Sequence, residues 1–123
     1  MTPANRDIPE LLAPAGDREA FLAAVAAGAD AIYCGVTGQL NARRRAGGIA
    51  SAELADLCEL AHGHGVRVDV TMNVVVKQAE LVDALAAARF AFGAGADALI
   101  IQDLGFIAAV REACPDAEIH VST

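Results

Sequence analysis

The densest group of charged side chains in the sequence is a run of three arginines, Arg43, Arg44 and Arg45. Each guanidinium group is permanently charged and presents a fork of N–H donors that suits a carboxylate or a phosphate. Most charge runs are solvated loops or form salt bridges to neighbouring acids, and that alternative stays open. Because the run follows an apolar segment that resembles a strand, the other interpretation is a loop that binds an anion.

Polar side chains also follow two later apolar segments, residues 66–72 and 98–101. Asn73 comes directly after the first, and Gln102 and Asp103 come directly after the second. Their amide and carboxylate groups could orient a substrate. For Asp103 the alternative is the N-cap of a helix that starts near residue 106.

His120 and Asp69 lie inside apolar segments. His120 could face a pocket or be a hydrogen-bonded core histidine. In the segment with Asp69, apolar and polar side chains alternate, which indicates a strand with two unlike faces. An Asp69 that points into a closed barrel needs a cationic or hydrogen-bonding partner, because an unpaired buried carboxylate is costly.

Three cysteines are scattered along the chain, at Cys34, Cys58 and Cys114. They show neither the paired spacing of a zinc or iron–sulfur site nor the even count of a disulfide-rich secreted protein. We expect buried, reduced thiols and no metal or other cofactor bound within this chain. The sequence displays no Ser/His/Asp or Cys/His arrangement that would indicate a protease mechanism.

Apolar residues recur at helical spacing in four stretches, around residues 21–28, 54–61, 81–88 and 106–113. Asp17 and Ser51 are expected to cap helix starts, and glycines at 28, 65 and 95 are expected to end helices. Short runs rich in Val, Ile and Leu between them predict five strands, at residues 10–13, 31–34, 66–72, 98–101 and 118–122. This alternation predicts right-handed βαβ units with parallel strands in sequential order.

The first strand-to-helix turn distinguishes two parallel architectures. An open dinucleotide-binding sheet places G-x-G-x-x-G there, whereas this chain has Pro14-Ala15-Gly16-Asp17 with a single glycine. The turn therefore favours part of a barrel, and a complete barrel needs eight strands and typically about 250 residues. The tripeptide Gly-Ala-Asp occurs at residues 28–30 and again at residues 95–97. Both duplication and convergence would explain this repetition.

Composition limits the class of protein. The chain has 123 residues, 55% of them hydrophobic, and a net charge of −7, which disfavours non-specific binding to nucleic acid or anionic lipid. The polar N-terminus shows no secretory signal, and no apolar stretch approaches the roughly 20 residues of a spanning helix. We expect a cytoplasmic protein with no membrane contact.

Six segments in order resemble the peptidase U32 family, also called collagenase-like proteases. They are residues 10–16, residues 28–33, the Arg43 and Arg45 pair, residues 70–73, residues 102–105 and residues 119–123. The chain departs from the family pattern at Gly48 and Ile49, where Asn and Phe are common, and at Asp69, where an aromatic residue is usual.

The resemblance implies a TIM-type parallel (β/α) barrel, of which residues 10–123 form the N-terminal half and residues 1–9 a disordered tail. It implies an enzyme that, when complete, acts as a peptidase or as an iron–sulfur-dependent hydroxylase of tRNA or rRNA bases or of ubiquinone. The signature cysteines of the family would lie beyond this chain, which by itself is expected to be inactive. The substrate-binding residues expected are Arg43, Arg45, Asn73, Gln102, Asp103 and His120.

A second hypothesis is a half-barrel without catalytic activity. Such a module would associate with another copy of itself, or with a separate C-terminal half of the barrel, and thereby bury its open side. The partners expected are accordingly that missing half or a homo-oligomer, with RNA, a quinone precursor or a peptide as substrate of the complete enzyme.

Overall fold

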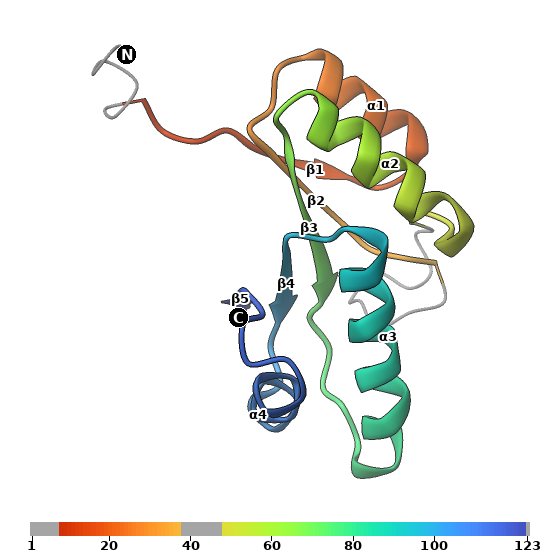
Figure 1. Cartoon of the computed structure of the whole chain (residues 1–123), viewed down its shortest axis with the longest axis vertical. Helices are drawn as coiled ribbons and strands as arrows, with labels where there is room; N and C mark the ends of the chain where they lie inside the picture. The colour runs from red at the N-terminus through yellow and green to blue at the C-terminus, as the bar shows by residue number, and fades with distance from the viewer. Residues whose placement is uncertain (1–7, 38–47, 123) are drawn as a thin grey trace.

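The structure is a computed structural model that describes residues 8–37 and 48–122. It contains one five-stranded parallel sheet with the strand order β1-β2-β3-β4-β5. Helices alternate with the strands along the chain (Figure 1). The elements are β1 (Leu12–Ala15), α1 (Arg18–Ala26), β2 (Ala31–Cys34), α2 (Ser51–Gly63), β3 (Arg67–Met72), η3 (Gln78–Glu80), α3 (Leu81–Ala94), β4 (Ala98–Ile101), α4 (Leu104–Ala113) and β5 (Ile119–Val121).

The predicted α/β class, strand count and sequential parallel order are all confirmed. Strands β2 and β4 have the predicted bounds, whereas β1 begins two residues later than expected, at Leu12. The turn after β1 is the predicted single-glycine turn, and Asp17 caps α1 through a 2.8 Å hydrogen bond from the Ala20 N–H to its Oδ1.

The predicted cap at Ser51 is wrong. Ser51 is already the first residue of α2, and Ala50 occupies the N-cap position without a side-chain hydrogen bond. The reason lies in the preceding residue, Ile49, which forms a parallel bridge with Val36 and donates its N–H to the Gly35 carbonyl at 2.8 Å. These contacts of Ile49 fix the backbone before the helix, so the N-cap position falls on the residue before the serine.

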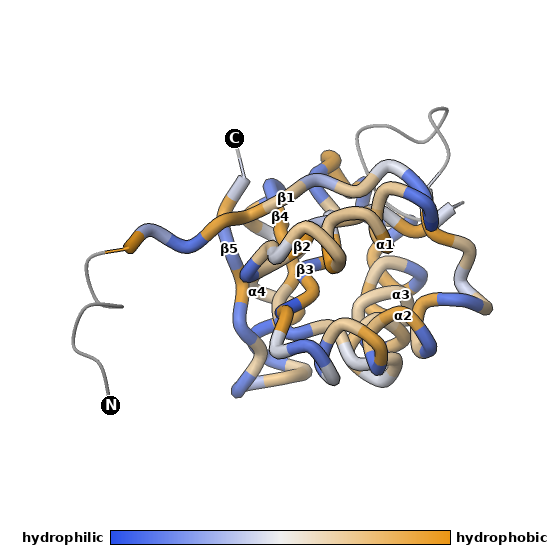
Figure 2. Tube along the Cα trace, turned by 90° about the horizontal axis from the view of Figure 1, so that it is seen from above, coloured by the Kyte–Doolittle hydropathy of each residue, from blue (hydrophilic) through white to orange (hydrophobic). Residues whose placement is uncertain are grey.

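The hydrophobic core takes its strand residues from one face of the sheet. Ile32, Val68 and Leu99 on this face are completely buried, as are Phe21 of α1 and Phe106 of α4. Hydrophobic residues are frequent along the strands, and polar residues are frequent on the outer turns of the helices (Figure 2). The strands therefore bury their apolar sides against the helices, as expected for βαβ units.

We call the other side of the sheet the open face. The strand register and the alternation of side chains place ten residues on it: Leu12, Pro14, Ala31, Tyr33, Arg67, Asp69, Thr71, Ala98, Ile100 and His120. Seven of them remain partly or largely exposed, and Ala31, Asp69 and Ala98 are buried. In a closed barrel this side of the sheet would face the interior.

The repeated Gly-Ala-Asp tripeptide has the same structural role at both places. The Asp30 N–H donates to the Leu11 carbonyl at 2.9 Å, and the Leu11 N–H donates to Asp30 Oδ2 at 2.7 Å. Asp97 and Val68 form the same reciprocal pair, at 2.7 and 2.8 Å. Each aspartate thus joins the start of one strand to the start of the next.

Across the described ranges, no helix is long and apolar enough to cross a membrane.

Candidate functional site

Polar side chains gather at the edge where the parallel strands have their carboxyl ends. Met72 is the register partner of Ile101, so Asn73 and Gln102, which follow them, lie on neighbouring strands at the same edge. Both are half-buried. The structure therefore brings two of the predicted site residues together, at the edge where barrel enzymes place their active sites.

The predicted arginine pair, Arg43 and Arg45, lies outside the described residues. The described residues on either side of this segment are joined at the same edge. The Thr37 N–H donates to the Ile49 carbonyl at 2.9 Å, directly beyond β2. Gly48 has φ +149°, and a Cβ atom there would lie 2.7 Å from the Gly35 carbonyl oxygen, so this close approach requires glycine.

Asp103 uses both carboxylate oxygens for the fold. Its Oδ1 accepts the Phe106 N–H at 2.9 Å and caps α4, and its Oδ2 accepts the Val76 N–H at 3.0 Å. These backbone hydrogen bonds hold the pKa of Asp103 below its ordinary value. The capping alternative is therefore confirmed, and Asp103 also holds the loop after β3 beside the start of α4.

His120 lies on the open face and not in the core. Its side chain is 45% exposed, Nε2 lies 2.8 Å from Glu118 Oε2, and Nδ1 lies 3.7 Å from Asp69 Oδ2. The core-histidine interpretation is thus wrong, because β5 turns this side chain toward the partly exposed side of the sheet. His120 lies below the edge that carries Asn73 and Gln102.

Asp69 has the cationic neighbour that its burial requires, in the form of His120. The Asp69 side chain is 4% exposed, and its Oδ1 has no hydrogen-bond partner within residues 8–37 and 48–122. Burial raises the pKa of Asp69 above its ordinary value, although the nearby His120 and Arg67 lower it in part. The sequence predicted the need for a partner but did not indicate that one oxygen would be left without a donor.

Glu118 and Arg67 complete a group of charges that sequence reasoning missed. Arg67 Nη2 donates to Glu118 Oε2, the same oxygen that lies beside His120 Nε2. The hydrogen bond from Arg67 and then that from His120 lower the pKa of Glu118. Residues 67 and 118 begin the segments around β3 and β5. Their opposite charges were the feature of the sequence that could have indicated this ion pair.

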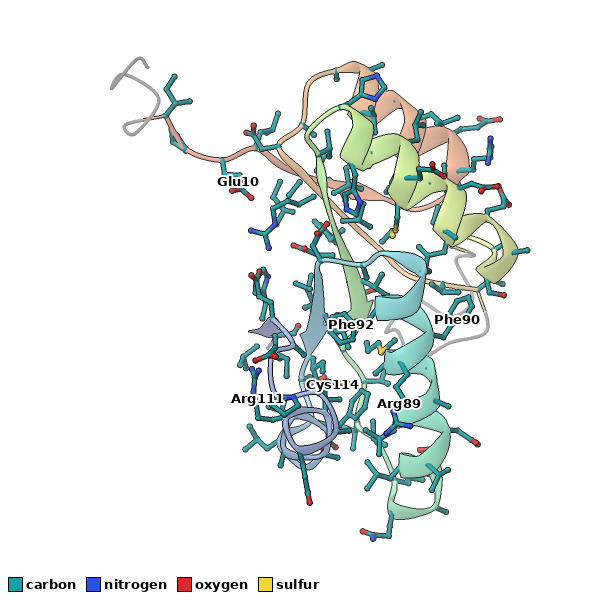
Figure 3. The ribbon with its side chains drawn as sticks, viewed as in Figure 1. Glu10, Arg89, Phe90, Phe92, Arg111 and Cys114 are labelled. Carbon is teal, nitrogen blue, oxygen red and sulfur yellow. The ribbon has the colours of Figure 1, made fainter. Side chains whose placement is uncertain are left out.

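The cysteines lie away from the open face. Cys34 and Cys58 are buried in the core, and burial raises the pKa of Cys34 to about 12 and that of Cys58 to about 11. Cys114, at the end of α4, is partly exposed (Figure 3). Within the described ranges, no three His, Cys, Asp or Glu side chains are placed to hold a metal ion. These thiols do not fit the ligand set of an iron–sulfur cluster, which needs convergent thiolates.

Comparison with known proteins connects this fold to one family. The sequence model of peptidase family U32 matches residues 16–123. The chain belongs to peptidase family U32. The match includes β2 to β5 and every described residue of the candidate site, and it confirms the resemblance seen in the sequence.

Three curated relatives show the range of names in the family. The chain is 36% identical over 114 residues to a 23S rRNA 5-hydroxycytidine synthase of Escherichia coli, covering 93% of this chain and 17% of the relative. It is 37% identical over 116 residues to tRNA hydroxylation protein P1 of Bacillus subtilis, with 94% and 27% covered. It is 29% identical over 114 residues to a collagenase of Porphyromonas gingivalis, with 93% and 27% covered. The chain thus spans less than a third of the length of each of these relatives.

Proposed function

We propose that residues 10–123 form the N-terminal half of a U32-type (β/α) barrel and that residues 1–9 are a tail outside it. Five parallel strands in sequential order are the first five of the eight that a closed barrel needs. β1 and β5 are the two edges of this sheet, and the open face carries half-exposed side chains from every strand. Three further strands would pair with both edges and enclose the open face.

We further propose that the complete barrel hydroxylates a base in RNA. The observation that carries this proposal is the adjacent position of Asn73 and Gln102 at the carboxyl edge of the sheet. Side-chain amides donate and accept hydrogen bonds together, as recognition of a nucleobase edge requires. In this proposal Arg43 and Arg45 bind a phosphate of the RNA, and His120 lies below the base.

A peptidase is the weaker candidate among the activities named in the family. Cys34 and Cys58 are poor nucleophiles because burial keeps their pKa values near 12 and 11, far above neutral pH. The names of two relatives described above refer to RNA hydroxylation, and one of them names a cytidine derivative. A quinone precursor would require the same hydroxylation chemistry but would not use a phosphate-binding arginine pair.

An iron–sulfur cluster in the complete protein would need ligands from outside the described residues. Cys34 is the last residue of β2, but its side chain, like that of Cys58, is buried in the hydrophobic core. We therefore assign no step of the chemistry to a cluster here. The role proposed for this chain is to bind and orient the base and its phosphate.

A chimera tests the proposal directly. Residues 10–123 replace the matching segment of the B. subtilis tRNA hydroxylation protein P1, and the chimera is expressed in a strain that lacks its tRNA hydroxylation proteins. We expect mass spectrometry of tRNA nucleosides to show restored hydroxylation. Asn73→Ala and Gln102→Ala should each lower it at least tenfold, since each loses a hydrogen bond to the base.

The matched control is Gln78→Ala, which removes an exposed amide in η3, farther along the connection after β3 than Asn73. It should leave hydroxylation within twofold of the parent chimera. A folded chimera that hydroxylates tRNA equally well with Asn73→Ala and Gln102→Ala would refute their role in binding the base. A folded but inactive parent chimera would refute the proposed activity of this segment.

The open edges support a second candidate, a half-barrel module that self-associates. Leu11 and Leu12 at β1 are 55% and 46% exposed, and Val121 in β5 is 70% exposed. Apolar side chains beside unpaired strand edges favour association with another chain. The oligomeric state of the chain in solution tests this candidate.

A further inference from the structure

Among the described residues, the buried carboxylate of Asp69 has a partner for only one of its oxygens. Oδ1 is closed to solvent and accepts no hydrogen bond from this part of the chain, and the whole residue is 3% exposed. A buried carboxylate oxygen is satisfied by a donor, a cation or a proton. Protonation of the carboxyl group satisfies it without a new contact.

Ionisable groups lie near Asp69 in each neighbouring strand or in the residue before it. They are Arg67 in β3, Asp97 before β4, and Glu118 and His120 at β5, with Cys34 of β2 on the core side of the sheet. Arg67 and Asp97 already have partners, in Glu118 and in His62 and the Val68 N–H. Tyr33 is the register partner of Asp69 on β2. His120 is therefore the group placed to exchange a proton with Asp69.

His120 connects the buried carboxylate to the solvent. Its Nδ1 faces Asp69 Oδ2 at 3.7 Å, and its Nε2 lies 2.8 Å from Glu118 Oε2 at the exposed edge of the ring. The His120 side chain is 45% exposed and the Glu118 side chain 48%. The two ring nitrogens thus lie between an inaccessible acid and an accessible one, and the 3.7 Å separation from Asp69 is too long for a hydrogen bond without a rotation of the ring.

We propose that Asp69 and His120 form a proton-relay pair on the open face, in which Asp69 holds a proton that His120 exchanges with solvent or with a molecule bound there. Rotation of the exposed imidazole brings Nδ1 to hydrogen-bond distance, about 2.8 Å. The N–H bond then breaks, its electron pair stays on the ring, and an O–H bond forms on the carboxyl group. The solvent reprotonates the neutral imidazole. The proposal goes beyond RNA modification, because it concerns this chain alone and needs no substrate.

The electrostatics of the site agree with this role. Burial raises the pKa of Asp69, so the folded chain holds a proton at a pH where the unfolded chain has lost it. The stability contributed by this proton is fully present below the unfolded pKa and is lost as the pH rises through the folded pKa. Replacement of Asp69 with a neutral residue should remove this pH dependence.

Nuclear magnetic resonance titration of the labelled chain tests the pair. The carboxyl carbon of Asp69 should titrate above the ordinary aspartate value of about 3.9. The variant His120→Gln removes the nearby positive charge and should raise this midpoint by about one further pH unit.

The matched control is Glu53→Gln, which removes a carboxylate that pairs with Arg18 on the surface. It should leave the Asp69 midpoint unchanged. An Asp69 midpoint at or below the ordinary value, or one that does not shift in His120→Gln, overturns the proposal. The His120 side chain is 45% exposed, so this variant provides the decisive titration even where replacement of Asp69 impairs folding.

Discussion

At the scale of single residues, position in a strand-to-helix turn determines what a carboxylate does. Asp17 and Asp103 each follow a strand and each cap a helix. Asp103 also binds the Val76 N–H, so each of its two oxygens accepts a backbone hydrogen bond. Asp69 differs because it lies inside a strand, where the backbone N–H groups are used by the sheet. It therefore depends on side chains from neighbouring strands.

The same dependence on position governs the thiols, and it leads to a prediction about their reactivity. In the folded chain at pH 8, iodoacetamide should modify Cys34 and Cys58 at least tenfold more slowly than Cys114. Burial raises the pKa of the first two to about 12 and 11 and blocks access, whereas Cys114 is partly exposed. Mass spectrometry of peptides from a time course measures the three rates.

The control for this prediction is the chain in denaturant, where the three rates should become equal within about threefold. Fast labelling of Cys34 under native conditions would show that the sheet opens locally at β2. It would also remove the argument that these thiols are poor nucleophiles.

At the scale of elements, the repeated Gly-Ala-Asp turn shows that a short sequence repeat can have a physical cause. In both copies the aspartate forms two hydrogen bonds with one residue at the start of the neighbouring strand that comes earlier in the chain. The aspartate N–H donates to the carbonyl of that residue, and the aspartate carboxylate accepts its N–H. An aspartate carboxylate placed one residue before a strand is well suited to accept such an N–H. This geometry accounts for the aspartate in each copy by convergence as well as by duplication.

The two copies differ in burial, which gives a prediction. Asp97→Ala should lower the free energy of unfolding by about 1 to 3 kcal/mol, because it leaves the part-buried Val68 N–H without its partner. Asp30→Ala should cost less, about 0.5 to 1.5 kcal/mol, because the Leu11 N–H is exposed and can bond to water. Urea denaturation of both variants measures the difference.

Asp56→Ala is the matched control, since Asp56 is an exposed residue of α2, and it should change stability by less than about 0.5 kcal/mol. If Asp30→Ala and Asp97→Ala lower the free energy of unfolding equally, burial of the backbone N–H does not determine how much stability is lost when its aspartate acceptor is removed.

Much of the fold was predictable because its signals are local. The apolar runs of β2 and β4 each follow a Gly-Ala-Asp turn whose glycine has a positive φ, which marks where the strand begins. The start of β1 was misplaced because Leu11 and Leu12 look equally strand-like, and pairing with Ala31 decides between them. The cap of α2 was misplaced because a tertiary contact of Ile49 outweighed the preference of serine for the N-cap.

The site was predictable in position more than in chemistry. Parallel strands place the residues that follow them at one edge, so Asn73 and Gln102 were found from the strand assignment alone. The grouping of Arg67, Asp69, Glu118 and His120 was not found, because it depends on which side chains of β3 and β5 face each other across β4. Such registers between strands that are far apart in sequence have no local signal.

At the scale of the whole molecule, the sheet has two edges and one face that the described residues leave partly exposed. A barrel removes edges by closure, and an open five-stranded sheet does not. Ile8, Leu11 and Leu12 lie exposed near the β1 edge, and Val121 lies exposed in β5. The proposed closed barrel and the proposed self-associating module both require these groups to be covered, and they differ in what covers them.

The chain by itself should therefore associate in a concentration-dependent manner. We expect sedimentation velocity between about 5 and 200 µM to show a shift from monomer toward dimer, with a melting temperature that rises with concentration. The double variant Leu12→Lys/Val121→Lys places charge at both edges, which natural edge strands use to prevent pairing, and it should remain monomeric. Val82→Lys is the matched control, because Val82 is 78% exposed on α3, away from both edges, and this variant should associate like the wild type.

Addition of the C-terminal remainder of the B. subtilis relative separates the two proposals. Under the barrel proposal this segment should convert the dimer into a 1:1 complex with a higher melting temperature, whereas a self-associating module should remain a dimer. A monomer at every concentration, with or without the added segment, would show that the five-stranded sheet is self-sufficient and would contradict both proposals.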